Sequence, residues 1–591
     1  NSPLLYEYKG EWKQAEVRHE IIEVRGAQSV ELDVTVTDHG PIIVGDPASG
    51  YAVAIKWPAN AAPNLGLEPI RSMLEPTNLG ELDESMREWT YPNNNFLSAD
   101  VHGDIGYLNR SKLPVRSIAN GWLPVPGWTG EHEWQGFVPF EEWVRHRNPE
   151  AGYIVSTNNM SVGEEYPHFI SLNFAPEYGT STVRSRRIID RLKALNKATV
   201  EEMASIHGDK VSIPARIYTR LLAHVEPLDE PSAGAKERLA GWDGTMDAKS
   251  VAATIYSAFR VHLDRMILRH VMGPMAEPSA GAKDHPWQAS NHILHLHALF
   301  VTMAKEGDTS MLPPGSNWSS LLAQALAEGV AYLSGELGDD MDSWTWGTVH
   351  YTRPQHNLSA SFPELATMLN PPSLSVGGDR DTPQSGGYST HGPFTVTGTA
   401  VGRLVFDTSD WNNSAWIVPL GASGHPGSPH YADQAPIWGE LKLIPMLYDW
   451  DRIAENAVSR QELSAMLGQI GRGKILTQEE AVSVVAQLRA DGKRLVFTNG
   501  CFDLIHGGHI EFLQKARAKG DLLVVGLNSD KSVKSIKGDG RPIKTEKERA
   551  NIISALKYVD YITIFDETTP EEVIREVRPD ILVKGDDYAM G

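Results

Sequence analysis

The chain has few of the features that mark disulfide-rich scaffolds, membrane proteins and nucleic-acid binders. Its 591 residues include one cysteine, Cys501, which excludes an internal disulfide and a cysteine-rich metal site. No apolar run approaches the roughly 18 to 20 residues of a membrane-spanning helix, and no secretory signal pattern opens the sequence. Basic residues are outnumbered, with 54 Lys plus Arg against 75 Asp plus Glu. Without a basic stripe, nucleic acid is not expected as a partner.

What the chain does have is length and an uneven distribution of charge. Its length is typical of about three or four domains, and 41% apolar residues supply sizeable cores. Residues 460–591 contain 20 basic and 20 acidic residues, so the net charge of −21 lies entirely in residues 1–459. A mixed-charge helical stretch with a Gly-rich break lies where the balance changes. We predict a first domain over 1–455, a join at 456–472 and a second domain over 473–591.

The most specific chemistry lies in residues 494–513, RLVFTNGCFDLIHGGHIEFL. Residues 495–497 have the pattern of a short apolar strand, 498–508 that of a turn-rich loop, and 510–518 that of an amphipathic helix. Such a loop presents backbone N–H groups and a helix N-terminus to an anion, and His506 and His509 lie beside it. The expected ligand is therefore a phosphate.

The motif NGCFD followed by HGGH resembles the HxGH nucleotidyltransferase superfamily. The blocks that follow are similar, in order, to the adenylyltransferase domain that makes ADP-heptose: GLNSD, GRPI, ERA, YVD, FDETTP and PDILVKGDDY. Glycerol-phosphate and ethanolamine-phosphate cytidylyltransferases share that scaffold. The resemblance implies a small Rossmann-like domain that uses Mg²⁺ with ATP or CTP. The closing Ser/Thr-Thr segment of the family, which contacts nucleotide phosphates, is expected beyond Gly591.

Phosphoryl transfer requires fixed donors for the charge that grows on the phosphate oxygens. His506 and His509 would supply them, and Lys537 and Arg549 are the cationic candidates for the β and γ phosphates, with Mg²⁺ shared between them. Asn528 and Asp530 end a strand where an open parallel sheet places its ligands. The residues predicted to bind the nucleotide are Thr498, Asn499, Gly500, Phe502, Asp503, Asn528, Asp530, Lys537, Arg549, Lys584, Gly585 and Asp586.

Residues 1–455 have the pattern of a β-rich body with helical insertions. Alternating strands are predicted at 30–38 and 51–57, and helices near 185–195, 252–269 and 319–333. This pattern predicts an α/β layered body, but periodicity alone gives it no function.

The sequence motifs of residues 1–455 are more specific than their periodicity. The blocks YEYKGEW, DHGPII, SADVHGDIGY, LPVPGWTGEHEWQGFVPFEEW, GYIVSTNNM, GWDGTM, WTWGTVH, GGDRDT and SGHPGSPHYADQAPIW resemble the penicillin acylase family in family order. The resemblance implies an N-terminal-nucleophile hydrolase with an αββα sandwich. It would cleave an amide, a carbon–nitrogen bond other than a peptide bond, in small molecules such as β-lactams or acyl-homoserine lactones.

In that family the nucleophile is a serine that opens the β-chain, and its own α-amine is the base. YEYKGEW matches a stretch some tens of residues inside that chain, so the nucleophile, the first β-chain segment and the whole α-chain are expected upstream of Asn1. Ser2 is followed by Pro3, unlike the family's opening, and is not expected to replace the nucleophile.

Two catalytic positions match the family. Asn158 corresponds to the side-chain amide that donates to the tetrahedral oxyanion, and Arg184 to the arginine that holds this asparagine. Judged by residue type alone, Asn158 would be a turn residue and Arg184 a solvated helix charge.

Three histidines at 292, 295 and 297 are close in sequence, but no carboxylate completes a tetrahedral set with them. No metal site within the protein is predicted.

Two activities are therefore expected. One is the transfer of AMP from ATP to a sugar phosphate of the heptose 1-phosphate type with release of pyrophosphate, and the other is the amide hydrolase of the acylase body. The alternative is cytidylyl transfer to a polyol or amino-alcohol phosphate, with the acylase part a silent scaffold. Acylases of this type are periplasmic or extracellular, whereas nucleotide-sugar synthesis needs cytoplasmic ATP. The localisation stays open, and the conflict favours a join of two incomplete pieces.

Overall fold

A computed structural model of the chain describes residues 4–46, 49–61, 69–163, 165–170, 183–280, 291–388, 394–458, 474–505 and 507–584. The chain forms two compact units, Asn1–Asn456 and Ala457–Gly591. Each unit has its own hydrophobic core, and each is described by itself below.

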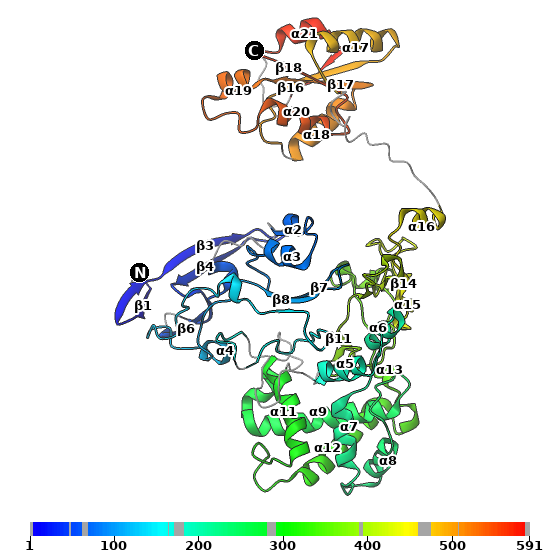
Figure 1. Cartoon of the computed structure of the whole chain (residues 1–591). Helices are drawn as coiled ribbons and strands as arrows, with labels where there is room; N and C mark the ends of the chain where they lie inside the picture. The colour runs from blue at the N-terminus through cyan, green and yellow to red at the C-terminus, as the bar shows by residue number, and fades with distance from the viewer. Residues whose placement is uncertain are drawn as a thin grey trace. The chain divides into compact units, whose positions relative to one another are not determined.

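The strands of the first unit form small antiparallel sheets (Figure 1). A four-stranded sheet has the order β3-β4-β5-β6, and a three-stranded sheet has the order β7-β8-β9. The strands of this unit are β1 (Leu5–Tyr8), β2 (Glu11–Gln14), β3 (Glu16–Ile22), β4 (Val30–Thr37), β5 (Gly40–Asp46), β6 (Tyr51–Ala54), β7 (Asn94–Ala99), β8 (Ile105–Arg110), β9 (Arg145–Arg147), β10 (Gly386–Tyr388), β11 (Val396–Thr399), β12 (Arg403–Val405), β13 (Ala415–Ile417) and β14 (Ile444–Pro445).

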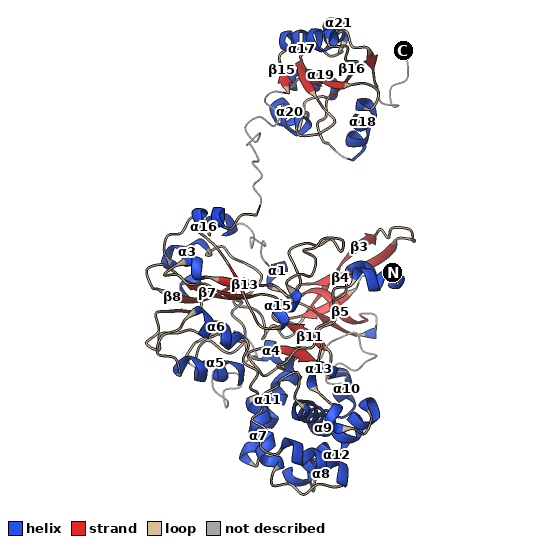
Figure 2. Ribbon diagram, turned by 90° about the vertical axis from the view of Figure 1, so that its right-hand side faces the viewer, coloured by secondary structure: helices blue, strands red, loops and turns tan. Residues whose placement is uncertain are grey.

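The helices of the first unit gather mainly on one side of these strands, where α7, α8, α9, α11 and α12 lie together in both views (Figure 2). They are α1 (Pro58–Ala61), α2 (Pro69–Ser72), α3 (Leu79–Ser85), α4 (Ala119–Trp122), α5 (Val183–Lys193), α6 (Val200–His207), α7 (Ile213–Leu222), α8 (Glu230–Leu239), α9 (Val251–Met272), α10 (Ala276–Ser279), α11 (Asn291–Glu306), α12 (Trp318–Leu337), α13 (Trp346–Val349), α14 (Ala366–Leu369), α15 (Ala435–Gly439) and α16 (Trp450–Glu455). The predicted helices near 185–195, 252–269 and 319–333 correspond to α5, α9 and α12.

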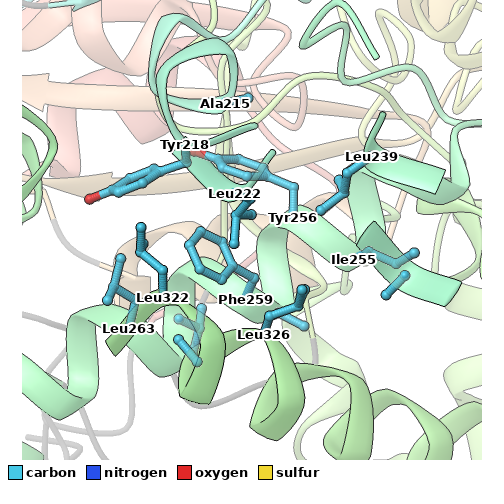
Figure 3. Packing of buried hydrophobic residues seen from close by; sticks show 14 of the residues in the cluster. Ala215, Tyr218, Leu222, Leu239, Ile255, Tyr256, Phe259, Leu263, Leu322 and Leu326 are labelled. Atoms are coloured by element: carbon cyan, nitrogen blue, oxygen red, sulfur yellow. The ribbon is translucent and has the colours of Figure 1, made fainter. Parts of the chain in front are cut away.

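Helix α9 is the centre of the main core because it is buried on nearly every side, as expected for a helix enclosed by others. The Ser250 side chain caps its first turn by accepting from the Ala253 N–H. Tyr218 of α7 packs edge-on against Phe259 of α9 with 5.5 Å between ring centres, and Leu322 and Leu326 of α12 lie in the same cluster (Figure 3).

Helices α9 and α12 approach closely at Gly329. A Cβ atom at this position would lie 2.8 Å from the Phe259 backbone nitrogen and 2.9 Å from the Ala258 carbonyl carbon. Backbone atoms in the middle of a packed helix cannot move aside cheaply. Glycine is therefore required here for the spacing of the two helices.

A buried ionic cluster connects α9 to the segment 379–382. Arg260 of α9 pairs with Asp381 and lies 3.6 Å from Asp264. The Asp381 N–H donates to Asp379 Oδ1 at 2.7 Å, while Asp379 Oδ2 is buried without a hydrogen-bond partner among the described residues. Burial raises the pKa of Asp379 and of Asp264 to about 7, with Asp381 adding to the rise and Arg260 opposing it.

The second unit is a five-stranded parallel sheet in the order β15-β18-β17-β16-β19. Its elements are β15 (Ile475–Leu476), α17 (Gln478–Ala490), β16 (Leu495–Gly500), α18 (Gly507–Arg517), β17 (Leu522–Asn528), α19 (Asp530–Lys537), α20 (Glu546–Ser554), β18 (Tyr561–Phe565), α21 (Glu571–Val577) and β19 (Ile581–Leu582). The predicted strand, loop and helix of residues 494–518 correspond to β16, the loop after it and α18.

Alternate residues of the central strands face opposite layers of helices, as the period of a strand requires. Val496 and Leu523 pack with Leu513 of α18 and Ile553 of α20. The neighbouring strand residues pack in a separate cluster with Val485 of α17 and with α21. Helices thus cover both faces of the sheet, which leaves its carboxyl edge as the place for a ligand.

We expect Gly329→Ala to destabilise the first unit by about 1–3 kcal/mol, because the added methyl group meets helix backbone. The measurement is urea unfolding followed by tryptophan fluorescence. All 16 tryptophans precede residue 451, so this signal reports the first unit alone.

The control is Gly335→Ala in the same helix, where an added Cβ meets no atom within 4 Å. Since alanine is the better helix former, this variant should gain about 0.5–1 kcal/mol. Equal effects of the two substitutions would contradict the close-contact explanation.

The free energy of unfolding of the first unit should fall as pH rises from about 4 to 7. Asp379 has a folded pKa of about 7, above its ordinary value, so the folded protein retains a proton that the unfolded chain releases in this window. Asp379→Asn cannot ionise and should flatten the pH dependence measured by urea unfolding at pH 5 and pH 8. Asp407→Asn is the control, because hydrogen bonds lower that exposed carboxyl's pKa to about 2, outside the window. An unchanged slope in Asp379→Asn would show that this carboxyl does not titrate there.

Candidate functional site

In the first unit, the candidate site lies in the turn around Asn158. Asn159 ties this turn together, because its Oδ1 accepts from the Thr157 N–H at 2.8 Å and its Nδ2 donates to the Met160 carbonyl at 2.9 Å. Asn158 is exposed and has a φ of 65°, in the left-handed region that asparagine tolerates better than most residues. The two adjacent asparagines thus have different tasks: Asn159 closes the turn and Asn158 projects from it.

Arg184, near the start of α5, fixes the side chain of Asn158. Its Nη2 donates to the Thr157 carbonyl at 2.7 Å and to Asn158 Oδ1 at 2.8 Å. A guanidinium only donates hydrogen bonds, so the amide atom that faces it must be the oxygen. The Asn158 NH₂ group is therefore directed away from Arg184 and is available as a donor.

The buried ionic cluster around Arg260 and Asp381 also acts electrostatically on Arg184. Burial lowers the pKa of Arg184, and the charge of Asp381 opposes this effect. The Arg184 guanidinium stays charged at neutral pH in any case, so Asp381 acts on it as a nearby opposite charge. Asp381 belongs to the block GGDRDT, but the sequence analysis predicted no role for it.

A cavity of about 170 Å³ lies against the same segment, between residues 154–161 and strand β8. Tyr107 and His146 form part of its wall. The Tyr107 hydroxyl donates to Asn95 Oδ1 at 2.7 Å and contacts Ser161 Oγ at 2.9 Å, and burial raises its pKa. The turn that presents Asn158 therefore borders a space with both aromatic and polar walls.

In the second unit, the predicted residues gather at the carboxyl ends of β16 and β17. The carboxylate of Asp503 is buried and accepts from Arg541 Nη1 and the Ile543 N–H, both at 2.7 Å. Burial raises its pKa, but the bonds from Arg541 and the backbone outweigh burial and leave the pKa below its ordinary value. Asp503 thus attaches the loop of residues 540–544 to the loop after β16.

Arg549 has a similar bracing position. Its side chain is fully buried, with 0% exposure. It donates to the carbonyl oxygens of Lys544 (3.0 Å), Cys501 (2.6 Å) and Asn528 (2.8 Å), and to Asp530 Oδ1 (2.7 Å). These bonds join the ends of the two central strands, so this geometry favours a positioning role for Arg549. Its direct contact with a phosphate remains a prediction.

The remaining predicted residues line the same edge. The Asn499 side-chain oxygen accepts from Lys584 Nζ, and burial lowers the pKa of that lysine. Asn528 is buried and donates to Ser532 Oγ at 3.0 Å, and Thr498 is also buried. Lys537 is exposed at the end of α19.

The turn after β16 brings His509 and Phe502 together. Phe502 has a φ of 45°, and its ring centre lies 5.5 Å from that of His509, in the first turn of α18. A Cβ atom at Gly500 would lie 2.9 Å from the Phe502 ring, so a larger residue would displace it. His506, Gly585 and Asp586 lie outside the described residues.

Two contributions were missed by the sequence analysis. Arg541 lies in the block GRPI, but its partner Asp503 is 38 residues away in the sequence, so the motif does not indicate their ion pair. Asp381 and Arg260 are far apart in sequence, so nothing in the sequence indicates that they form an ion pair.

Residues 1–455 match the penicillin amidase family, and residues 497–591 match the cytidylyltransferase-like family. Penicillin acylase 2 proenzyme from Pseudomonas sp. strain SE83 is 36% identical over 468 residues, which cover 77% of this chain and 57% of that protein. Bifunctional protein HldE from Wolinella succinogenes is 52% identical over 115 residues, which cover 20% of this chain and 24% of that protein. The chain thus spans little more than half of the first relative and about a quarter of the second.

Among solved structures, a thermostable penicillin G acylase from Alcaligenes faecalis superposes with a TM-score of 0.55 at 20% identity, over 78% of this chain and 83% of that one. This likeness confirms the predicted N-terminal-nucleophile hydrolase fold of the first unit. The parallel sheet of the second unit, with helices on both faces, agrees with the predicted Rossmann-like nucleotidyltransferase fold.

Among the described helices, none combines the length and the apolar character that crossing a membrane requires. Both matched families are enzyme families, and the matches extend over both units. The chain belongs to the penicillin amidase family through residues 1–455 and carries a cytidylyltransferase-like domain at residues 497–591.

Proposed function

We propose that residues 1–455 are the body of an amide hydrolase in which Asn158 supplies a donor to the oxyanion. The observation that carries this proposal is the bond from Arg184 to Asn158 Oδ1, which leaves the amide NH₂ group directed outward. A preorganised donor of this kind favours the transition state because it needs no reorganisation when charge develops. The substrates are carbon–nitrogen bonds other than peptide bonds, in acylated small molecules such as β-lactams or acyl-homoserine lactones.

In the proposed reaction a serine oxygen attacks the amide carbon, and the carbonyl electron pair moves to the oxygen. Asn158 Nδ2 donates to that oxygen, while the α-amine of the serine takes its proton and passes it to the leaving nitrogen. Water then releases the acyl group from the serine. In the matched family this serine opens the β-chain, and we propose that the α-chain is the partner with which the activity is assembled.

Asn158→Gly should lower kcat for amide cleavage by about 10²–10³-fold, as when a side-chain oxyanion donor is removed. Glycine is chosen because it accepts a φ of 65° without strain and so removes the amide while keeping the turn. The measurement is steady-state hydrolysis of an acyl-amide substrate by the natural full-length product.

Asn159→Ala is the matched comparison, since it disrupts the turn but removes no outward donor. It should lower thermal stability more than Asn158→Gly does. Wild-type turnover in Asn158→Gly would mean that Asn158 serves only as a turn residue.

A second function is favoured by a separate observation at the carboxyl edge of the parallel sheet. This edge carries His509, in the first turn of α18, and the contact between Asn499 and Lys584. We propose that the domain over residues 473–591 transfers AMP from ATP to a sugar phosphate of the heptose 1-phosphate type. An oxygen of the sugar phosphate attacks the α-phosphorus, and the bond to the β-phosphate oxygen breaks, releasing pyrophosphate. When bound, Mg²⁺ would neutralise phosphate charge, and Asp530, whose Oδ1 accepts from Arg549 at this edge of the sheet, would be a candidate ligand.

His509→Ala should reduce pyrophosphate release by about 10²-fold or more, because a fixed donor to the phosphate charge is lost. The control is Gln514→Ala, an exposed position in the same helix, which should leave the rate unchanged. The rates are compared with ATP and with CTP in the natural product. A preference for CTP would replace adenylyl by cytidylyl transfer to a polyol or amino-alcohol phosphate, and an unaffected His509→Ala would remove His509 from catalysis.

The two proposed reactions would take place in different compartments, since the first belongs to a family of usually exported enzymes and the second uses cytoplasmic ATP. We propose that each unit functions independently of the other, in keeping with their separate cores.

A further inference from the structure

Arg403, at the start of β12, is a buried arginine that has no counter-ion among the described residues. Its side chain is 4% exposed, its Nη1 donates to the Trp438 carbonyl at 2.6 Å, and its guanidinium lies 4.3 Å from the centre of the Trp438 ring. Within the described part of the chain, no carboxylate lies within 4.0 Å of it. The other buried arginines differ, since Arg260 pairs with Asp381 and Arg549 with Asp530.

An unpaired buried charge is costly, so the surroundings of Arg403 must compensate for it. Stacking on an indole and one bond to a carbonyl oxygen provide part of this compensation. A guanidinium has five N–H donors, however, and within the described residues only Nη1 donates to a protein acceptor.

A cavity of about 90 Å³ lies beside this side chain. It is lined by His207, Pro383, Gln384, Ser385, Ala400, Gly402 and Arg403. Its volume is well above the ~10–15 Å³ that a single water needs, so an anion of a few heavy atoms fits. His207 Nδ1 and Gln384 Oε1 are buried and have no hydrogen-bond partner among the described residues. The residues that line the cavity therefore supply both a fixed charge and two polar side chains, each with an atom that lacks a partner among the described residues.

The charge of the cavity favours an anion of a single negative charge. Burial lowers the pKa of Arg403 to about 10, so it is charged at neutral pH. Burial, together with the charge of Arg403, lowers the pKa of His207, so this imidazole is neutral at pH 7. One positive charge is balanced by one negative charge, whereas a dianion would leave a buried excess.

We propose that this cavity binds a small monovalent carboxylate, of the size of acetate, with Arg403 as its counter-ion. The planar guanidinium matches the two oxygens of a carboxylate. A neutral His207 donates through Nδ1 in one tautomer, and the Gln384 amide presents its NH₂ group when turned by 180°, an orientation that the hydrogen-bond network decides. This site is separate from the Asn158 turn and does not depend on either proposed activity.

The test is a saturation-transfer NMR titration of the whole chain with acetate and, in parallel, with acetamide, its neutral analogue of the same shape. Acetate should bind saturably, and acetamide at least tenfold more weakly. Equal binding of the two would overturn the proposal, because it would show that the charge is not recognised.

Arg403→Gln should weaken acetate binding by at least tenfold. The matched control is Arg145→Gln, since Arg145 also donates to a backbone carbonyl, of Phe140 at 2.8 Å, and lies over that residue's ring, but it is exposed and outside the cavity. The control should bind acetate as the wild type does. Acetate binding that is unchanged by Arg403→Gln would overturn the assignment and would place the binding elsewhere, including the second unit.

Gln384→Glu provides a second test that keeps Arg403 in place, in case its replacement prevents folding. The new carboxylate would occupy the cavity as an internal counter-ion, so acetate binding should be lost while thermal stability rises. Wild-type acetate affinity in a folded Gln384→Glu protein would overturn the proposal.

Discussion

The ion pair between Arg260 and Asp381 connects the helical core of the first unit to its candidate site. Arg260 is held by α9, the most enclosed helix, so its position is set by the packing around Phe259. The charge of Asp381 in turn opposes the lowering of the Arg184 pKa by burial. Arg184 holds the oxygen of the Asn158 amide and so decides which way its N–H groups point. The side chain that orients the Asn158 amide thus lies in the electrostatic field of an ion pair that is anchored in the core.

The second unit uses the same kind of interaction for a different purpose. Arg549 and Asp503 are buried at the ends of adjacent strands, and each binds backbone groups of a neighbouring loop. Charged groups that bind several backbone atoms fix loops more firmly than apolar contacts do, because their hydrogen bonds have direction. The loops that carry the predicted phosphate ligands are therefore positioned by charged residues that do not themselves need to contact a nucleotide.

How much the sequence predicted depended on the kind of residue. Helices α9 and α12 and strand β16 were predicted to within a few residues, because their apolar patterns are strong. Asn158 and Arg184 were selected only through family resemblance, and the structure places them in contact. Arg549 is predicted to contact a phosphate, and that stays a prediction; its hydrogen bonds to the carbonyl oxygens of neighbouring strands are tertiary contacts that a motif does not contain. The sequence did not single out Arg403, because whether an arginine has a counter-ion depends on which residues surround it in the folded structure.

The close approach of α9 and α12 at Gly329 also fixes the axial position of α12 along α9. Neighbouring turns of α12 present Ala325 and Leu333 on the same face, four residues away in either direction. If α12 slid along α9 by four residues, about 6 Å, either of these side chains would be forced against the backbone near Phe259. Only one axial position of α12 is therefore permitted, and a single missing side chain selects it from alternatives that would bury apolar surface nearly as well.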